Sequence, residues 1–393
     1  MSESCKYLII GGGIAADAAV RGIRRLDNSG SITVLCGEKH PPYDRPPLSK
    51  KLWTGKPLDS IWHQTEAAGA ILRLGVRALT GDPDVRSVRD DVGNTYIYEK
   101  LLIATGGSPR RLGFADDGVT YFRTIDDYEH VRTLADRGAK FVVLGGGFIG
   151  SEIAAALATK GCPVSMIFPA ASIGAHFYPP ALSAFVNDFY RQKGITVITR
   201  DSAKSIEKTI QGMTVSTAGG RTLSADGVIA GIGIQPELGL ARSMGLATDN
   251  GIVVDEQLRT TRPDIYAAGD VANFFSTALG VRRRVEHEDN ALAMGAMAGR
   301  NMAGNSEKYE HLPYFYSDLF DLGYEAVGEM GGDLEVVEDW KERFRKGVIY
   351  YLRDSKVRGV LLWNTWGQVD AARKLIANHE PIDEHSLRGR ISD

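Results

Sequence analysis

The amino-acid sequence predicts an α/β protein in which two parallel-sheet domains are followed by a C-terminal α+β domain. The first observation is an internal repeat, since KYLIIGGGIAADAA (6–19) and KFVVLGGGFIGSEIA (140–154) each read as an apolar strand, a glycine run and a helix of small residues. The second is a change of character from about Lys308, where β-branched and aromatic runs flank a turn. A chain of 393 residues has room for about two to four domains.

The composition excludes several classes of protein. The chain is 43% hydrophobic and 24% charged, which is ordinary for a globular protein, and its net charge of −3 gives no reason to expect nucleic acid or a membrane as partner. No apolar run reaches the roughly 20 residues of a membrane helix, and the start lacks the basic and apolar regions of a secretory signal. We therefore expect a soluble, cytoplasmic protein.

The cysteines argue against redox chemistry by a dithiol. Cys5, Cys36 and Cys162 are the three cysteines, and no CxxC or CxxxxC pair occurs. Three thiols also cannot supply a four-thiolate cluster, and we expect no metal site. We expect reduced thiols that pack as small apolar groups.

The first domain is expected to begin as a strand–helix–strand unit and to continue with short antiparallel strands and a buried strand that ends in glycines. These segments are, in order, Tyr7–Ile10, Ile14–Leu26, Ile32–Leu35, Arg86–Asp90, Thr95–Tyr98 and Leu101–Gly107. The strands expected in Gly251–Asp255 and Asp264–Asp270 return to this domain, so that the second domain is an insertion within it. The first domain then comprises residues 1–118 and 235–307.

The second domain, residues 119–234, is expected to repeat this plan, and the third to comprise residues 308–393. Antiparallel strands are expected at Thr196–Thr199, Ser205–Glu207 and Met213–Thr217, with a buried strand in Asp226–Gly233. In the third domain we expect a hairpin of Gly347–Arg353 and Val357–Trp363, a helix at Gln368–Asn378, and Trp363 and Trp366 in the core.

The first glycine motif, Gly11-x-Gly13-x-x-Ala16, has the order of a dinucleotide-binding turn. The first glycine permits the tight turn, the second lets the backbone approach a pyrophosphate, and the small Ala16 allows close helix packing. The helix N-terminus offers N–H groups and the positive end of its dipole to the phosphates. Glu38, just past the second strand, is placed to bind ribose hydroxyls.

The second motif is Gly145-x-Gly147-x-x-Gly150, followed by a strand at Val164–Phe168. An NAD site usually has an acid after this strand and an NADP site an arginine, but Pro169–Ser172 supplies neither. Nucleotide choice therefore stays open, and we expect a preference for NADH because no cation in this segment would bind a 2′-phosphate. Two Rossmann-type domains in one chain fit two dinucleotides that meet face to face.

Several longer segments carry a family resemblance. PPYDRPPLSK (41–50), LLIATGGSPR (101–110), GGGFIGSE (145–152) and DIYAAGDVA (264–272) resemble the FAD-dependent ferredoxin reductases of bacterial oxygenase systems. RRRVEHEDNA (282–291) and YLRDSKVRGVLLWN (351–364) are similar to apoptosis-inducing factor. The resemblance covers essentially the whole chain. It implies a glutathione-reductase-like fold of the pyridine nucleotide-disulfide oxidoreductase superfamily, without the redox disulfide.

The resemblance implies four catalytic residues: Lys50, Glu152, His287 and Tyr316. Lys50 would lie near flavin N5 and pair with Glu152, since a buried lysine is costly without a carboxylate. His287, at the entry of a helix expected at Asp289–Met302, would contact nicotinamide or tune the flavin, and a simple loop contact is the alternative. Tyr316 stands where the relatives usually carry tryptophan beside the flavin or nicotinamide, and tyrosine keeps an apolar face.

The resemblance also implies which residues bind the cofactors, FAD and NAD(P)H. Asp270 would bind the FAD ribitol, while Arg45 and Arg110 would face the pyrophosphate or the flavin edge. The complete set is Gly11, Gly13, Ala16, Glu38, Arg45, Lys50, Ala104, Thr105, Gly106, Arg110, Asp270, Glu286, His287, Gly145, Gly147, Phe148, Ile149, Gly150, Glu152, Gly231 and Gly233.

The function implied is hydride transfer from NADH to FAD, followed by electron transfer to an external acceptor: a ferredoxin- or rubredoxin-type protein, a quinone or oxygen. The alternative is a redox-gated interaction protein with slow NADH oxidase activity, like apoptosis-inducing factor. Arg282–Arg284 would attract a small acidic iron–sulfur protein, and a solvated charge run is the equal alternative. We expect a monomer or homodimer, with association that depends on redox state.

Overall fold

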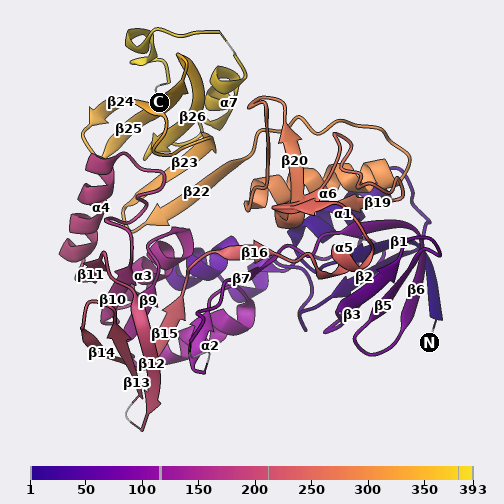
Figure 1. Cartoon of the computed structure of the whole chain (residues 1–393), viewed down its shortest axis with the longest axis horizontal. Coiled ribbons are helices and arrows are strands. Elements are labelled where there is room, and N and C mark those ends of the chain that lie inside the picture. Colours follow the sequence, from indigo (N-terminus) through magenta and orange to yellow (C-terminus); the bar gives the residue numbers. More distant parts are fainter. Residues whose placement is uncertain (1, 115–116, 211, 379, 392–393) are drawn as a thin grey trace. The chain divides into compact units, whose positions relative to one another are not determined.

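The computed structural model describes residues 2–114, 117–210, 212–378 and 380–391 (Figure 1). The chain forms two compact units. Unit one comprises Met1–Asp44, Leu58–Ser108 and Gln235–Phe315, and unit two comprises Arg45–Pro57, Pro109–Ile234 and Tyr316–Asp393. The segment from 316 onward thus shares a unit with residues 109–234, and the separate third domain stays a prediction.

Unit one is built on a seven-stranded sheet. Its elements are β1 (Ser2–Ile10), β2 (Ile32–Cys36), β3 (Ala70–Leu74), β4 (Ala78–Asp82), β5 (Ser87–Asp90), β6 (Thr95–Ile103) and β19 (Ile265–Ala267), with helices α1 (Ile14–Arg24) and α6 (Glu288–Met302). The order β3-β2-β1-β6 is that of a parallel dinucleotide-binding sheet. β19 pairs parallel with β6, which confirms that this segment returns to the first sheet.

β6 differs from the prediction, because Thr95–Tyr98 and Leu101–Ile103 belong to one strand. Its first residues pair antiparallel with β5, and its whole length pairs parallel with β1, from Ser2↔Thr95 to Ile10↔Ile103. The strand continues through Glu99 and Lys100: buried and exposed positions alternate from Tyr96 to Glu99, and Leu101–Ile103 are all buried.

Helices α1 and α6 pack with their backbones in close approach. A Cβ added to Gly295 would lie 2.2 Å from the carbonyl oxygen of Ala15, and one added to Gly299 would lie 2.2 Å from that of Ala19. Any side chain at these glycines would force the helices apart.

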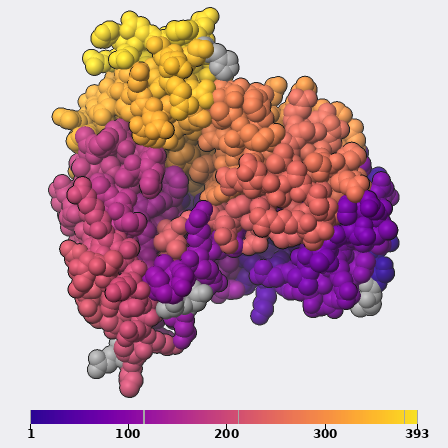
Figure 2. Space-filling view, in the orientation of Figure 1, coloured from indigo at the N-terminus to yellow at the C-terminus, as the bar shows by residue number. Residues whose placement is uncertain are grey.

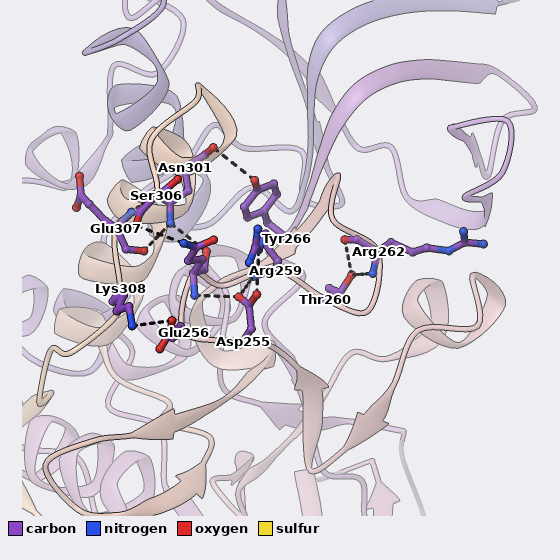
Figure 3. Close-up of polar contacts among 11 residues, drawn as sticks. Asp255, Glu256, Arg259, Thr260, Arg262, Tyr266, Asn301, Ser306, Glu307 and Lys308 are labelled. Atoms are coloured by element: carbon purple, nitrogen blue, oxygen red, sulfur yellow. Dashed lines mark hydrogen bonds and ion pairs between the residues drawn. The ribbon is translucent and has the colours of Figure 1, made fainter.

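The segment after strand β18 (Gly251–Val253) is tied to the C-terminal end of α6 (Figure 3). The Tyr266 hydroxyl donates to the carbonyl oxygen of Asn301 at 3.4 Å, and the Asn301 amide donates to the carbonyl oxygen of Glu307 at 3.0 Å. Lys308 pairs with Glu256 at 2.8 Å. In Figure 2 the coral and orange atoms of residues 235–315 lie directly against the indigo and purple atoms of the earlier unit-one segments.

Unit two contains a five-stranded parallel sheet in the order β11-β10-β9-β15-β8 (Figure 1). Its elements are β8 (Val119–Tyr121), α2 (Ile125–Ala135), β9 (Phe141–Leu144), α3 (Phe148–Thr159), β10 (Val164–Phe168), α4 (Pro180–Gln192), β11 (Thr196–Thr199) and β15 (Gly227–Ala230). The prediction of an antiparallel strand at Thr196–Thr199 is wrong, because β11 pairs parallel with β10 as the third strand of the Rossmann order. The antiparallel strands β12 (Ala203–Thr209), β13 (Gly212–Thr217) and β14 (Thr222–Ala225) form a separate sheet, which confirms the remaining two predicted strands.

The C-terminal part of unit two contains an antiparallel sheet and helix α7 (Val369–Ala377). Its strands are β22 (Tyr314–Leu319), β23 (Leu322–Gly328), β24 (Glu335–Glu342), β25 (Lys346–Arg353) and β26 (Lys356–Trp363). β25 and β26 form the predicted hairpin, and Trp363 is fully buried. The prediction for Trp366 is wrong, since 47% of it is exposed: it follows the end of β26, and its ring only covers Gly323.

The shorter elements complete the described chain. They are the single-turn helices η1 (Pro46–Ser49), η2 (Lys51–Thr54), η3 (Leu58–Ile61), η4 (Gly269–Val271) and η5 (Glu384–Leu387), helix α5 (Gly239–Ser243), and strands β7 (Gly107–Pro109), β16 (Ile234–Pro236), β17 (Thr248–Asp249), β18 (Gly251–Val253), β20 (Ala272–Ser276) and β21 (Val281–Arg283). β18 lies in unit one, where it pairs with β17 and β20 in a separate four-stranded sheet and not with β6 of the seven-stranded sheet.

The three cysteines are buried free thiols, as predicted. Burial raises the pKa of Cys5 to about 11 and that of Cys36 to about 12, so both thiols stay protonated at neutral pH. Within residues 2–114, 117–210, 212–378 and 380–391, no helix combines the length and the apolar character needed to cross a bilayer.

Candidate functional site

The turn between β1 and α1 has the shape of a phosphate cradle. Gly11 has φ +122°, and a Cβ there would lie 2.1 Å from the carbonyl oxygen of Ala104, so only glycine fits. Gly13 caps α1 without a side-chain hydrogen bond, and a Cβ added to it meets no atom within 4 Å. The space beside Gly13, at the start of α1, is therefore open, which fits the pyrophosphate of a dinucleotide.

The other predicted residues of this edge follow the neighbouring strands. Ala104 donates its N–H to the carbonyl oxygen of Ile10 at 2.8 Å, which holds the end of β6 beside the glycine turn. Thr105 donates its hydroxyl to the carbonyl oxygen of Glu237 at 3.0 Å, and Gly106 has φ +65°. The Glu38 carboxylate, after β2, accepts a hydrogen bond from the Tyr43 hydroxyl at 2.6 Å, which orients it.

Asp270 is brought to the same helix end by η4. A Cβ added to Gly269 would lie 3.1 Å from the Cβ of Ala15, so η4 packs against the first turn of α1. The carbonyl oxygen of Asp270 accepts a hydrogen bond from the Arg284 guanidinium at 3.1 Å, and Arg284 also pairs with Glu286 at 2.6 Å. Asp270 and the chain that enters α6 are thereby linked.

His287 is the N-cap residue of α6, and its ring orientation is fixed by stacking. The imidazole lies parallel to the ring of Phe315, with centroids 4.4 Å apart and planes 16° from parallel. We did not identify Phe315 from the sequence, although it lies directly beside Tyr316 in the PYFYSDL segment. The prediction that α6 begins at Asp289 is short by one residue, since the helix begins at Glu288.

The arginine run has a structural role that the sequence did not reveal. The Arg282 guanidinium donates to the carbonyl oxygens of Val254 and Asn273 at 3.0 and 2.7 Å. Together with the Arg284 bonds, this shows that two of the three arginines hold the backbone of unit one. Neither predicted interpretation, a partner-binding patch or a solvated run, includes this role.

The glycine turn of unit two repeats the cradle with tighter packing. Gly145 has φ +118°, and a Cβ there would lie 2.3 Å from the carbonyl oxygen of Gly231. A Cβ on Gly150 would lie 2.2 Å from the carbonyl oxygen of Gly145, so helix and turn are in backbone contact. Gly147 caps α3 without a side-chain bond, and an added Cβ meets no atom within 4 Å. This helix end, too, fits a pyrophosphate.

The predicted ion pair between Lys50 and Glu152 is present. The Lys50 Nζ lies 2.7 Å from a Glu152 carboxylate oxygen, and the side chains are 8% and 2% exposed. The hydroxyls of Ser49 and Ser317 each donate to Glu152 at 2.6 Å. A buried carboxylate with three donors is well satisfied, so Glu152 holds Lys50 in one place.

Tyr316 and Asp318 surround this pair. The Lys50 Nζ lies 5.1 Å from the centre of the Tyr316 ring, which is a cation–π distance. Burial raises the pKa of Asp318, the nearby Lys50 lowers it and Glu152 raises it again. Ser49, Ser317 and Asp318 were not singled out in the sequence, although each is next to a predicted residue or one position beyond it.

The remaining predicted residues of unit two are placed as follows. Phe148, at the start of α3, packs on the ring of Phe177 with centroids 4.9 Å apart, and Ile149 beside it is 38% exposed. The Arg110 N–H donates to the carbonyl oxygen of Gly233 at 2.9 Å, and its guanidinium to that of Ile234 at 3.3 Å. The Arg45 guanidinium donates to the carbonyl oxygen of Arg123 at 3.1 Å.

The predicted site residues thus form two sets. Unit one contains Gly11, Gly13, Ala16, Glu38, Ala104, Thr105, Gly106, Asp270, Glu286 and His287. Unit two contains Arg45, Lys50, Arg110, Gly145, Gly147, Phe148, Ile149, Gly150, Glu152, Gly231, Gly233 and Tyr316. Lys50 contacts both Glu152 and Tyr316, whereas the Arg45 and Arg110 guanidinium groups donate to backbone carbonyl oxygens. Among the residues that the structure describes, no cluster of three His, Cys, Asp or Glu side chains is placed to hold a metal ion.

Comparison with known proteins identifies the family. The model of the family described as pyridine nucleotide-disulphide oxidoreductase matches residues 5–295, and that of the C-terminal part of apoptosis-inducing factor matches residues 335–378. Apoptosis-inducing factor 1 of Dictyostelium discoideum is 34% identical, over 97% of this chain and 80% of the relative. The ferredoxin–NAD(+) reductase component of the anthranilate 1,2-dioxygenase system of Burkholderia cepacia is 33% identical, over 97% and 96%. Monodehydroascorbate reductase 3 of Arabidopsis thaliana is 32% identical, over 97% and 94%.

Solved structures of similar proteins have the same fold. The ferredoxin reductase for the CYP199A2 system from Rhodopseudomonas palustris has a TM-score of 0.89 at 29% identity, covering 97% of this chain and 96% of the other. The putidaredoxin reductase–putidaredoxin complex matches with a TM-score of 0.91 at 29% identity, covering 98% and 95%.

These matches confirm the predicted fold class, the family resemblance, and FAD and NAD(P)H as cofactors. The enzyme passes electrons from NAD(P)H through FAD to an acceptor outside the chain. The chain therefore belongs to the pyridine nucleotide-disulphide oxidoreductase family, as an FAD-dependent NAD(P)H oxidoreductase similar to the ferredoxin reductases and to apoptosis-inducing factor.

Proposed function

We propose that this enzyme reduces a ferredoxin-type iron–sulfur protein with electrons from NADH. The observation that carries the proposal is the pairing of two open glycine cradles with three separate, buried cysteines, which leave no dithiol to receive electrons within the chain. Burial keeps the Cys5 and Cys36 thiols protonated and therefore poorly reactive. The relative from the anthranilate dioxygenase system, by its name, serves a ferredoxin.

The proposed FAD site lies in unit one. When bound, FAD accepts a hydride and releases electrons singly or in pairs. The N–H groups at the start of α1, beyond Gly13, hold the pyrophosphate, and Glu38, oriented by Tyr43, accepts hydrogen bonds from ribose hydroxyls. Asp270, packed against the same helix end through Gly269, holds the ribitol.

The proposed NADH site lies in unit two, at Gly145, Gly147 and Gly150. Lys50 orients the nicotinamide, and its position is set by Glu152, which is in turn held by two serine hydroxyls. A fixed cation costs little reorganisation when the substrate arrives, so this arrangement favours a productive geometry.

His287 and Tyr316 have proposed roles in positioning and tuning. Stacking on Phe315 fixes the His287 ring, and Lys50 lies over the Tyr316 ring. Hydride transfer needs no separate proton donor at either residue, because the hydride itself carries the chemistry. Both are therefore proposed to act by placement and electrostatics and not as general acids or bases.

The test is anaerobic stopped-flow reduction by NADH, followed by a panel of acceptors. The panel comprises a bacterial ferredoxin, a rubredoxin, a quinone, oxygen and the monodehydroascorbate radical, the last because several relatives with 30–32% identity are named monodehydroascorbate reductases. Faster reoxidation by the ferredoxin than by all other acceptors supports the proposal. Faster reoxidation by any other acceptor overturns it.

A second candidate function is a redox-gated interaction protein. It is favoured by the match of residues 335–378 to the C-terminal part of apoptosis-inducing factor. This function requires a long-lived reduced complex and a change in oligomeric size on reduction, which light scattering under anaerobic conditions would measure. The oligomeric state and a cytoplasmic location stay predictions from the sequence.

A further inference from the structure

Arg200 lies at the sheet edge where a dinucleotide's adenosine is expected. β10 and β11 are parallel neighbours (Figure 1), with Phe168 paired to Thr199. Arg200 is therefore the first residue beyond β11, just as Pro169 is the first beyond β10. The glycine turn opens at the same edge, because the Gly145 N–H donates to the carbonyl oxygen of Ile167 at 2.9 Å. In a Rossmann sheet, residues after the second strand contact the adenosine ribose.

Backbone hydrogen bonds tie Arg200 to Pro169–Ser172, the segment after β10 that contains neither an acidic nor a basic residue. The Arg200 N–H donates to the carbonyl oxygen of Ala170 at 3.1 Å, and the Asp201 N–H to that of Phe168 at 3.3 Å. The same segment is tied to the glycine turn, since the Gly174 N–H donates to the carbonyl oxygen of Gly146 at 3.0 Å. Arg200 is thus beside the position that selects between NAD and NADP, although it comes from the next strand.

The backbone of Arg200 is held in an unusual conformation. Its φ is +56°, in the left-handed region that residues other than glycine seldom adopt. The buried Asp201 carboxylate fixes this corner by accepting bonds from the N–H groups of Ser202 and Gly219 at 2.9 and 2.8 Å and by pairing with Arg221 at 2.9 Å. Such conformations persist where surrounding structure determines them, and they are frequent at ligand sites.

The Arg200 side chain is available to a ligand. It is exposed, and among the described residues its guanidinium has no hydrogen-bond, ion-pair or ring partner. Arg221, its neighbour in space through Asp201, is already engaged. A guanidinium presents a planar set of donors that matches a phosphate group.

We propose that Arg200 binds the 2′-phosphate of NADPH, so that this enzyme accepts NADPH as well as NADH. This inference rests on the proposed function, because it requires the adenosine of the nicotinamide dinucleotide to lie over the ends of β10 and β11. It revises the expectation drawn from Pro169–Ser172, which considered only the residues that follow β10. The sequence could not show that a cation from β11 is brought beside them.

The test compares binding of 2′,5′-ADP and 5′-AMP to the oxidised, FAD-containing protein by titration calorimetry. The variants are Arg200→Asn, since asparagine tolerates a left-handed φ, and Arg200→Lys, which keeps the charge. Arg137→Asn is the matched control. Arg137 is also exposed in unit two, but it precedes β9 and so lies at the amino ends of the parallel strands, whereas Arg200 lies at their carboxyl ends. Melting temperatures of all variants show whether the fold is retained.

We expect the parent protein to bind 2′,5′-ADP more tightly than 5′-AMP. Arg200→Asn should lower the affinity for 2′,5′-ADP by about tenfold, equivalent to about 1.4 kcal/mol, with less than a twofold change for 5′-AMP. Arg200→Lys should retain most of the affinity for 2′,5′-ADP, and Arg137→Asn should match the parent protein for both probes.

Two results would overturn the inference while leaving the proposed function in place. An equal loss of both probes would show that Arg200 stacks on adenine, and unchanged binding of both would show that it makes no contact. If the parent protein binds neither probe and is not reduced by NADH, the proposed function fails together with the inference.

Discussion

Replacement of Lys50 by alanine tests both the stability and the chemistry assigned to the buried ion pair. The pair has a 2.7 Å contact and side chains 8% and 2% exposed, so Lys50→Ala leaves a carboxylate almost completely out of water. Loss of one partner of such a pair costs about 3–5 kcal/mol. Two serine hydroxyls still donate to Glu152, so the expected loss is about 3 kcal/mol, at the low end of this range.

A second substitution separates charge from packing. In Lys50→Ala/Glu152→Gln the buried group is neutral, so the double variant should be more stable than Lys50→Ala alone. Urea unfolding of the FAD-containing proteins measures the difference, and Lys51→Ala, an exposed neighbour, is the control. A double variant no more stable than Lys50→Ala would show that the carboxylate charge is not the source of the loss.

The single variant Lys50→Ala should also slow flavin reduction by NADH about tenfold or more, while FAD remains bound. Without Lys50 the nicotinamide is no longer held in the orientation that hydride transfer requires. FAD binding should change less, since the residues proposed to hold it lie in unit one and Lys50 lies in unit two. Stopped-flow absorbance and the ratio of FAD to protein measure the two effects. Reduction at the parent rate would refute the role of Lys50 in orienting the nicotinamide.

The remaining predictions concern unit one and the nicotinamide contacts. The purified protein should be yellow with about one FAD per chain, and Gly11→Ala should abolish this colour because the added methyl overlaps a backbone oxygen; retained flavin absorbance would contradict it. His287→Ala should keep FAD yet change the reduction rate, and Tyr316→Trp should lengthen the life of a long-wavelength charge-transfer band, which stopped-flow absorbance would detect. The hydrogen bond with Asp44 raises the pKa of His63 above its usual 6.5, so this contact should stabilise the protein fully below about pH 6.5 and lose its effect as pH rises through the raised value. Unfolding free energies of the parent and His63→Gln, compared from about pH 5 to about pH 9, should converge at the high end, and a gap that is constant with pH would contradict the assignment.

The two parallel sheets could be predicted because their signals are local. An apolar run, a glycine turn and a helix of small residues lie within about 15 consecutive positions at each repeat. The orientation of Thr196–Thr199 could not be predicted, because four alternating residues look the same in a parallel and an antiparallel pair. Trp366 was misassigned because a large apolar side chain at a strand end can equally cover a glycine at the surface.

The site was less accessible to sequence reasoning because its contacts join distant positions. Ser317 donates to Glu152 across 165 positions, and only the resemblance suggested that Lys50 and Glu152 meet. The backbone-binding role of Arg282 was hidden for the same reason, since a charged run does not show which carbonyls fold back onto it. The type of a residue predicts which interactions its side chain can make, but only the folded topology determines which distant residues it contacts.

Glycines that contact a backbone and glycines that face open space have different consequences for how the sequence can vary. Gly295 and Gly299 contact the backbone of α1, so any replacement there should reduce the amount of folded protein in a cell. Gly13 and Gly147 face open space, so alanine at these positions should leave abundance nearly intact and reduce only activity. A library scored once for abundance and once for turnover would therefore sort the glycines of this enzyme into two classes, one kept by folding and one kept by the nucleotide.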